Sequence, residues 1–503
     1  MHSNGLQVYS LLNFLLGMVF APKMVALIFL AADLLALATI PSVLLRRRGR
    51  PLAALSWVLA VVAIPVFGVG AWWVLGRTHL YRLRRRRQES ALTFEARSLT
   101  PADALPESKT STRFAEVLPF ATSNHAWADG VFPPTEANSV ELLVDGRQAF
   151  PAMAQAIEAA RRQIHVMFYI WHPDEAGRNL RDLLARKASE GLTVRILVDA
   201  VGSPGIRGAF VVPLKEAGAT IVSFLPVRFR PWAPAFNFRN HRKLLVVDGA
   251  VAFTGGMNIG NEYEKRWHDL VVRIRGPAVA QLNSIFEEDW FFAAGENLGE
   301  GAPARENAPG VRHDPGSVAQ SAPAACAVIA SGPDRQSRIH DAFFLAISQA
   351  RQRVLLTTPY FIPSHAILAA LRGAAQRGVD VRILLPRHSD VRLVGLASRS
   401  YYPGLLTEGA QIFEYTGDMM HAKALVIDDW LSVLGSANVD SRSFRLNFEL
   451  ACFISSPDLN ARLAEVFGGA LHQSSEVNLA VMERRPHYLA LAESLAHLLS
   501  PLL

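Results

Sequence analysis

The chain has 503 residues, half of them hydrophobic, and a formal net charge of +7. This length gives room for about three domains. Ten arginines and no acidic residue lie between residues 46 and 87, so the rest of the chain sums to 7 − 10 = −3. A generally basic surface of the kind that coats nucleic acid is therefore excluded. Cys326 and Cys452 stand in apolar segments, which predicts small buried side chains and no disulfide framework.

Two long apolar runs lie near the amino terminus. The first covers residues 8–45 and the second covers residues 51–76. Each is long enough to cross a hydrocarbon core, which takes about 20 helical residues, and we place the first span near 24–45. Residues 1–87 are therefore predicted to form a transmembrane helical hairpin. Buried helices of a soluble protein are the alternative.

The arginines around these runs bear on the topology. Six arginines follow the second run and four lie between the runs, and an excess of Lys and Arg marks the cytoplasmic side of a membrane. We therefore expect the rest of the chain on the cytoplasmic side. A hairpin that enters one leaflet without crossing would also fit arginines at both ends.

The middle of the chain contains an internal repeat. Residues 88–137 are polar and predict a connecting segment, after which strand and helix patterns alternate. The pattern that leads to VRILVD at 194–199 recurs before VRILLP at 381–386. This alternation predicts an α/β fold with two similar halves, 138–292 and 326–478, each with a mixed sheet flanked by helices.

Two further segments complete the predicted organisation. Residues 293–325 are rich in Gly, Ala and Pro and predict a loose linker. Residues 479–503 predict an amphipathic helix. Its apolar face collects Tyr488, Leu491, Leu495, Leu498, Leu499 and Leu502. Packing of this face on the rest of the protein and association with a membrane are both open.

One motif occurs twice, once in each half. Residues 240–258 read NHRKLLVVDGAVAFTGGMN and residues 420–438 read MHAKALVIDDWLSVLGSAN, with the shared spacing HxKxxxxDx6G[GS]xN. A single His-Lys pair on a strand is most often without chemistry, but two copies in one register make coincidence improbable. The candidate catalytic set is His241, Lys243, Asp248, His421, Lys423 and Asp428.

Strand geometry predicts how the motif residues are oriented. Side chains two apart share a face, so each His should project together with its Lys. Asp248 and Asp428 have the opposite parity, and we expect them to act as structural partners at a turn into the next strand. The end of that strand should deliver Asn258 or Asn438 beside the His-Lys pair.

A carboxylate and a small residue also recur at fixed offsets. Asp269 and Glu449 each lie 28 residues beyond the histidine of their own half, and each could hold that imidazole in one tautomer. Ser436 replaces the Gly256 of the first copy, so a hydroxyl donor is available on one side only.

The paired motif resembles the HKD motif of the phospholipase D superfamily, over about residues 138–478. In that superfamily two halves pack face to face and share one site. The two apolar runs, TTPYFIP at 357–363 and SANVDSRSFRLNFE at 436–449 are similar to bacterial cardiolipin synthases. The resemblance implies an enzyme of the bacterial inner membrane, with several membrane passes, that joins two phosphatidylglycerol molecules into cardiolipin and releases glycerol.

Two histidines that face one phosphodiester can divide the reaction. One attacks phosphorus while the other protonates the departing alcohol, and a covalent phosphohistidine results. The second histidine can then deprotonate an incoming alcohol. The resemblance implies that His241 is the nucleophile and His421 the acid/base, although the symmetry of the motifs does not decide this.

Charge stabilisation at phosphorus is expected from protein groups. Lys243, Lys423, Asn258 and Asn438 would supply fixed donors for the phosphoryl oxygens. A metal often fills that role, but the sequence shows no acidic cluster at metal-binding spacing. We therefore expect no metal and no cofactor.

Three functions compete at this point. A phosphatidyltransferase would have phosphatidylglycerol, cardiolipin and the bilayer as partners. A hydrolase with water as acceptor, either a lipid phospholipase D or a nuclease, is the alternative, but a nuclease needs no anchor and favours a basic groove. A membrane scaffold with an inactive site is disfavoured because both motifs are intact. The sequence does not predict an oligomeric state.

Overall fold

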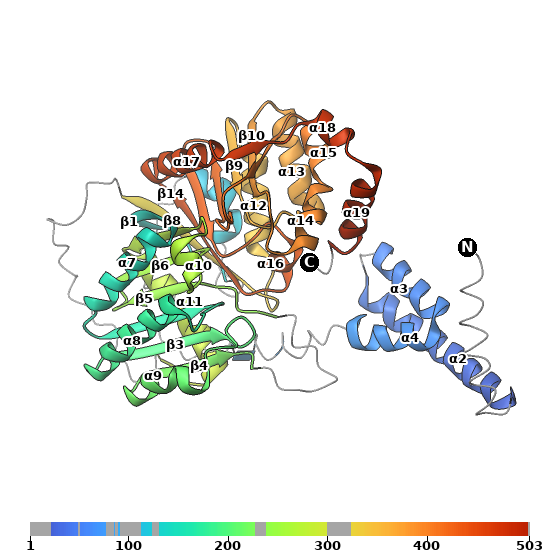
Figure 1. Ribbon diagram of the computed structural model, residues 1–503, viewed down its shortest axis with the longest axis horizontal. Coiled ribbons are helices and arrows are strands. Elements are labelled where there is room, and N and C mark those ends of the chain that lie inside the picture. Colours follow the sequence, from blue (N-terminus) through green and yellow to red (C-terminus); the bar gives the residue numbers. More distant parts are fainter. Residues whose placement is uncertain are drawn as a thin grey trace. The chain divides into compact units, whose positions relative to one another are not determined.

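The computed structural model describes residues 22–48, 51–76, 85, 89–90, 112–122, 130–226, 238–298 and 323–500. The chain divides into two compact units, one with the amino-terminal helices and the other with the sheet and both motifs (Figure 1). Our predictions for residues 1–21, for most of the connecting segment and the linker, and for Leu502 fall outside the described residues.

The amino-terminal unit consists of apolar helices. They are α2 (Pro22–Arg46), α3 (Pro51–Ala63), α4 (Pro65–Ala71) and a short π-helix (Trp72–Gly76). The predicted first span is confirmed as one continuous helix, of which Phe29–Arg46 is long and apolar enough to cross a membrane. Trp72 anchors the packing of the unit, because it is buried, lies 5.3 Å from the Trp57 ring and donates to Ser42 at 3.3 Å.

The second apolar run is not one helix. Pro65 lacks a backbone N–H and restricts the residue before it, so α3 ends at Ala63 and α4 begins after Ile64. The apolar helix Ala53–Ala63 is too short to count as a span. The described residues therefore contain one candidate span, and the multi-pass topology stays a prediction.

The other unit is built on one sheet of fifteen strands. The first half contributes β1 (Thr135–Val144), β2 (Gln163–Phe168), β3 (Thr193–Asp199), β4 (Thr220–Phe224), β5 (Leu244–Val247), β6 (Val251–Gly255) and β7 (Leu270–Arg275). The second half contributes β8 (Ala324–Ser331), β9 (Arg353–Thr357), β10 (Asp380–Pro386), β11 (Gln411–Tyr415), β12 (Ala424–Ile427), β13 (Leu431–Gly435), β14 (Glu449–Ser455) and β15 (Ser474–Glu476).

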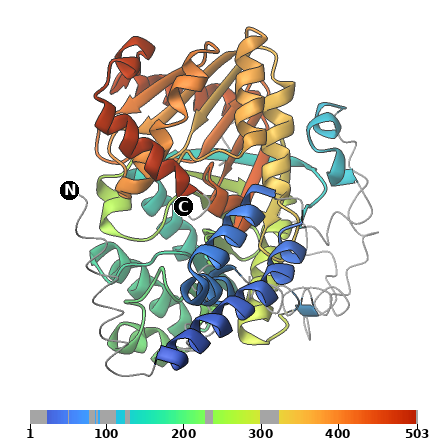
Figure 2. The same cartoon turned by 90° about the vertical axis from the view of Figure 1, so that its right-hand side faces the viewer.

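The strand order confirms the repeat. The first half runs β4-β3-β2-β5-β6-β7-β1, and the second half runs β11-β10-β9-β12-β13-β14-β8, with β15 added at the edge. In each half three strands are parallel and the others are antiparallel, which is the predicted mixed sheet. The halves join where β1 pairs antiparallel with β8, and Figure 2 shows them one above the other, in green and in orange to red.

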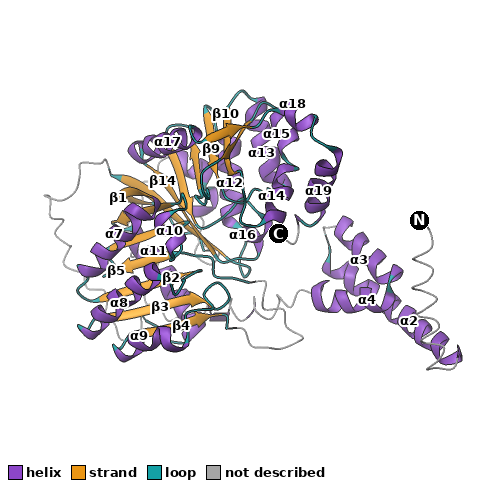
Figure 3. Ribbon diagram, viewed as in Figure 1, coloured by secondary structure: helices purple, strands orange, loops and turns teal. Residues whose placement is uncertain are grey.

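Helices cover both faces of this sheet (Figure 3). Those of the first half are α7 (Asp145–Glu158), α8 (Glu175–Ser189), α9 (Val212–Glu216), α10 (Asn261–Lys265) and α11 (Ala278–Ala294). Those of the second half are α12 (Arg338–Gln349), α13 (His365–Gln376), α14 (Arg392–Arg399), α15 (Tyr402–Leu406), α16 (Ser441–Arg445) and α17 (Pro457–Leu471). α6 (Thr112–Val117) packs against α12.

The two halves share one hydrophobic core. Apolar side chains of α11 and α17 lie in the same cluster with buried residues from strands of both halves. α11 contacts β8 of the second half, and α17 contacts β1 of the first. Each half also has a core of its own, under α7 and α8 in the first and under α12 and α13 in the second.

The predicted carboxyl-terminal helix is divided in two. α18 (Leu479–Glu483) and α19 (His487–Leu498) are separated at Arg484, Arg485 and Pro486. α19 packs against α14, beside which Figure 1 places it.

Candidate active site

The two motif aspartates hold the hairpins in place. Asp248 and Gly249 both have positive φ, 54° and 65°, as a tight turn between β5 and β6 requires. The Asp248 carboxylate accepts the backbone N–H groups of residues 161–163 at 2.8 to 2.9 Å. Asp428, φ 51°, accepts those of residues 351–353. Both carboxylates lie at the strand ends away from the histidines, so we assign them a structural role outside the reacting set.

Each motif histidine is paired with a carboxylate of the other half. Nδ1 of His241 lies 3.0 Å from Glu449 Oε1, and Nδ1 of His421 lies 2.6 Å from Asp269 Oδ2. The prediction that each carboxylate serves the histidine of its own half is therefore wrong. Because the carboxylate accepts the Nδ1 proton, the lone pair of each neutral imidazole is at Nε2.

Two short backbone bridges between the halves cause this exchange. Asn240 pairs with Phe448, and the N–H of His241 donates to the Phe448 carbonyl at 2.9 Å. The equivalent bridge joins Met420 to His268, whose carbonyl accepts the N–H of His421 at 2.8 Å. In each bridge, one partner is followed in the chain by the histidine of its half, and the other partner is followed by the carboxylate of the other half. The two histidines consequently occupy one shared site.

The lysines of the motifs are buried beside the histidines. Lys243 Nζ donates to the His241 carbonyl at 2.6 Å, and Lys423 Nζ donates to the His421 carbonyl. Burial lowers the pKa of Lys243 well below its ordinary value and that of Lys423 to about 8. Both ammonium groups lower the pKa of both histidines. The two positive charges therefore lie close to the shared site.

Burial also controls the histidines and their carboxylates. It lowers the pKa of His241 and of His421 to about 4, and the lysines add to this effect. For Asp269 and Glu449 burial alone would raise the pKa, but the hydrogen bond from the neighbouring histidine and the charge of the neighbouring lysine hold it below its usual value. The resting site therefore contains neutral imidazoles and ionised carboxylates near pH 7.

The two carboxylates are held unequally. Glu449 accepts from the Ser436 hydroxyl and from Asn447 Nδ2 at 3.1 Å. Asp269 accepts from the backbone N–H of Leu270 at 2.8 Å. A Cβ at Gly256, the counterpart of Ser436, would lie 2.3 Å from Asp269 Oδ1. The hydroxyl donor that only the second copy of the motif has thus binds Glu449.

The motif asparagines have partners in the protein. Asn258 accepts the N–H of Ile170 and donates to the Tyr263 hydroxyl, both at 3.0 Å. Asn438 hydrogen-bonds Asp440, the N-cap of α16. These contacts fix the loops after β6 and β13, and the contacts with phosphoryl oxygens stay a prediction.

Aromatic walls of the site were not predicted. Tyr169 packs edge-on against the His241 ring at 4.8 Å, and Tyr263 and Trp267 lie 5.4 and 5.2 Å from the His421 ring. Burial raises the pKa of Tyr169, so its hydroxyl stays protonated. The runs MFYIW, at the end of β2, and NEYEKRW, after Asn258, were the available signals in the sequence.

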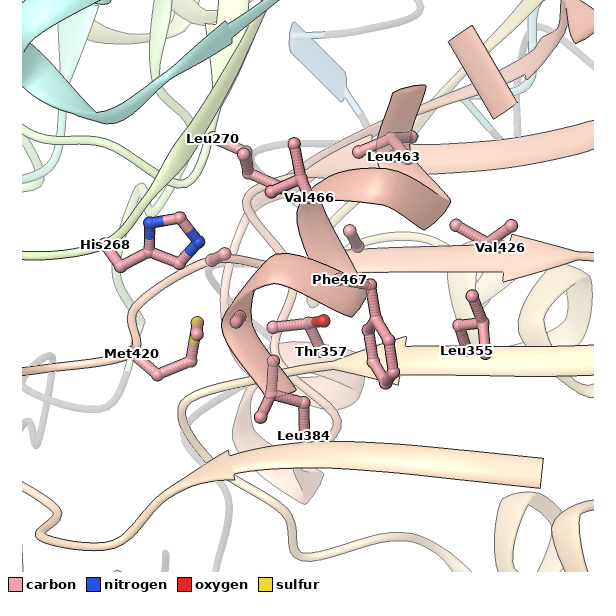
Figure 4. A pocket seen from close by; sticks show the side chains of 13 residues that line it. His268, Leu270, Leu355, Thr357, Leu384, Met420, Val426, Leu463, Val466 and Phe467 are labelled. Atoms are coloured by element: carbon pink, nitrogen blue, oxygen red, sulfur yellow. The ribbon is translucent and has the colours of Figure 1, made fainter. Parts of the chain in front are cut away.

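A small cavity near the site is a packing gap. It measures about 10 Å³ and lies behind the bridge between His268 and Met420, under Phe467 of α17 (Figure 4). Its other lining residues are mainly leucine, valine and alanine, and one water needs about this volume together with several polar partners. We therefore do not assign substrate to it. Among the described residues no group of three or more His, Cys, Asp or Glu side chains could hold a metal ion.

Comparison with known proteins connects this site to a family. A family model described as cardiolipin synthase, PLD-like domain, matches residues 153–290 and 344–471, one segment in each half. Cardiolipin synthase 1 of Bacillus anthracis is 35% identical over 468 residues, which cover 90% of this chain and 89% of the relative. The cardiolipin synthase of Geobacillus thermodenitrificans is 35% identical over 466 residues, with coverage of 90% and 89%.

A solved structure shares the fold. The phosphatidylserine synthase of Haemophilus influenzae superposes with a TM-score of 0.55 at 16% identity, and the match covers 72% of this chain and 95% of that chain. The matched segments contain both motifs, and the identity to the curated relatives extends over 90% of the chain. The protein thus belongs to the cardiolipin synthase family with phospholipase D-like domains.

Proposed function

We propose that the protein is a cardiolipin synthase, a phosphatidyltransferase that joins two phosphatidylglycerol molecules and releases glycerol. The observation that carries this proposal is the exchange of carboxylates between the halves, because it brings two oriented histidines into one site. Membership of the family supports the choice of substrate.

In the first step His241 Nε2 attacks phosphorus of the donor phosphatidylglycerol. The bond from phosphorus to the glycerol headgroup oxygen breaks as His421 delivers a proton to that oxygen. The phosphodiester anion opposes the effect of burial on His421, and Asp269 stabilises its imidazolium. Glycerol leaves and a phosphatidyl group stays on His241.

In the second step the proton returns to the same histidine. His421, now neutral, accepts the proton of a glycerol hydroxyl on a second phosphatidylglycerol as that oxygen attacks phosphorus. The bond from phosphorus to His241 breaks, and cardiolipin forms. The bonds broken and made are of the same kind, so added glycerol should drive the reaction backwards.

The unequal carboxylates support this assignment of roles. Glu449 shares its charge with Ser436 and Asn447, so it stabilises an imidazolium less than Asp269 does. The histidine beside Glu449 is therefore better suited to stay neutral and attack. The histidine beside Asp269 is better suited to carry a proton.

The lysines provide the charge at phosphorus. Lys243 and Lys423 both act on both histidines, and their ammonium groups would stabilise the phosphoryl oxygens in the transition state. Tyr169, Tyr263 and Trp267 exclude water, which competes with the lipid alcohol for the phosphohistidine.

The same proposal covers location and organisation. We place residues 1–87 in the bacterial inner membrane as a multi-pass anchor, followed by the connecting segment at 88–137. The halves at 138–292 and 326–478, joined by the linker at 293–325, then act on the cytoplasmic side. The candidate span in α2 supports an anchor.

A product assay tests the function. Purified protein with labelled phosphatidylglycerol, without nucleotide or added metal, should yield cardiolipin and glycerol in equal amounts. Phosphatidic acid as the main product would show that water is the acceptor and that the protein is a hydrolase. A requirement for a cytidine nucleotide lipid would contradict the proposed donor.

A further inference from the structure

The carboxyl-terminal helices expose a concentrated apolar surface. Exposed large apolar side chains in the described part of the sheet-bearing unit lie almost entirely on α18, α19 and the start of α14, with Val201 and Val212 elsewhere. We call this surface the tail face. It consists of Val391, Leu393, Val481, Tyr488, Leu489, Leu491, Leu495, Leu498 and Leu499.

The orientation of α19 is fixed from its other side. Glu493 is 3% exposed and accepts from Arg485 Nε at 2.9 Å. His497 Nδ1 lies 3.0 Å from the Ser400 hydroxyl, and Ala496 is buried against α14. Meanwhile Leu491 is 60% exposed. The helix therefore packs through its polar and small residues and presents its leucines outward, so packing on the catalytic region does not account for the predicted apolar face.

The tail face borders the active site. Asp390, immediately before the tail-face residue Val391, accepts the Tyr360 hydroxyl at 2.9 Å and acts on the Lys423 ammonium. Ile362, after β9, packs with Ala496 of α19. The exposed surface and the shared site thus lie at the same edge of the second half.

Basic residues surround the tail face. Arg387 is exposed directly after β10, Arg392 is exposed at the start of α14, and Arg484 is exposed between α18 and α19. An apolar helix face with a tyrosine and flanking arginines is typical of segments that lie in the interface of an anionic bilayer. The arginines are complementary in charge to the negative headgroups, and the leucines are suited to burial among the acyl chains beneath them.

We propose that the tail face inserts into the surface of an anionic bilayer and holds the catalytic site against the headgroups. The proposal concerns binding to the membrane and so goes beyond the transfer reaction. It rests on the proposed function only because that function makes a lipid the ligand of the tail face. It gives a second membrane contact, independent of the amino-terminal helices. Both substrate molecules would reach the shared site from the same surface.

Site-specific fluorescence tests the occupant. A polarity-sensitive dye on Leu495→Cys, in full-length protein reconstituted into vesicles of phosphatidylglycerol and phosphatidylcholine, should shift to the blue and be quenched by lipids with brominated acyl chains. The matched control is Val212→Cys, an exposed apolar position on α9, which Figure 1 places far from α19. Equal quenching at both positions would overturn the proposal. A blue shift without quenching would show that protein covers the face and would also overturn it.

Activity separates this inference from the function itself. The double variant L491E/L495E should make cardiolipin about tenfold more slowly from phosphatidylglycerol in vesicles, because two apolar side chains no longer enter the interface. Its rate with short-chain phosphatidylglycerol in detergent should equal that of the unaltered protein, and V212E should change neither rate. Equal rates for all three proteins in vesicles would contradict insertion of the tail face into the bilayer. Absence of cardiolipin from the unaltered protein in both assays would instead contradict the proposed function.

Discussion

The two active-site carboxylates differ in how many donors share their charge. Glu449 is bound by Ser436 and Asn447 as well as by His241, whereas Asp269 has a backbone N–H and His421. A carboxylate with more hydrogen bonds stabilises a neighbouring imidazolium less. Small changes beside the motifs can therefore give two identical catalytic residues different roles.

Ser436→Ala tests this difference. Loss of one donor leaves more charge on Glu449, so the pKa of His241 should rise from its value of about 4. The acidic limb of the pH profile of kcat/KM should move to higher pH, with little change in rate near pH 8. Ser432→Ala is the control, because Ser432 lies in β13 and pairs with Ile454, at the other end of β14 from Glu449. Identical limbs in the two variants would contradict the role of Ser436.

Three buried histidines should make the fold sensitive to acid. Burial lowers the pKa of His165, His241 and His421 from 6.5 to about 4. Between these values the unfolded chain binds more protons than the folded chain, so stability should be complete above pH 6.5 and fall as pH decreases toward 4. Thermal unfolding of the protein in detergent would measure the slope. His165→Gln should make the slope smaller, and an unchanged slope would argue against a neutral buried imidazole.

At the level of elements, the sequence predicted correctly the hairpins and helices that depend on interactions between residues close in the chain. The hairpins of the motifs follow from short apolar strands and Asp-Gly or Asp-Asp turns, and α2 follows from a long apolar run that only Lys23 and Asp33 interrupt. The second run was misjudged because hydropathy ignores the effect of Pro65, in the middle of the run, which ends α3. The tail was predicted as one helix, but Pro486 divides it and tertiary contacts of Glu493 decide which face is buried.

The hairpin aspartates should contribute stability. Asp428→Asn replaces a charged carboxylate that accepts three backbone N–H groups by a neutral amide, which is a weaker acceptor and has an NH2 group in place of the second oxygen. The free energy of unfolding should fall by about 1–3 kcal/mol, with catalysis per folded molecule preserved. Asp458→Asn, exposed in the first turn of α17, should have a much smaller effect. Loss of catalysis in a fully folded Asp428→Asn protein would return this residue to the catalytic set.

At the scale of the whole molecule, the active site forms only where the two halves of the repeat associate. The sheet is continuous through β1 and β8, and α11 and α17 share a core. The motif identified which residues act, but the pairing of carboxylates with histidines depends on the bridges between distant segments, residues 240 with 448 and 268 with 420. An offset of 28 residues is the same for pairing within a half or between halves, so the sequence could not distinguish them.

A substrate with a good leaving group should reveal the exchanged pairing in function. A phosphatidyl ester of nitrophenol needs no proton on its departing oxygen, so it bypasses the general acid. Asp269→Asn, acting through His421, should slow transfer from phosphatidylglycerol by about 10²-fold and should be rescued with the nitrophenyl ester in the first step. Glu449→Gln, acting through His241, should slow attack on both substrates. His421→Ala and His241→Ala establish the roles independently, because only the variant that lacks the acid should release nitrophenol. Rescue of Glu449→Gln together with His421→Ala would show that carboxylate and histidine pair within each half, contrary to the contacts between Asp269 and His421 and between Glu449 and His241.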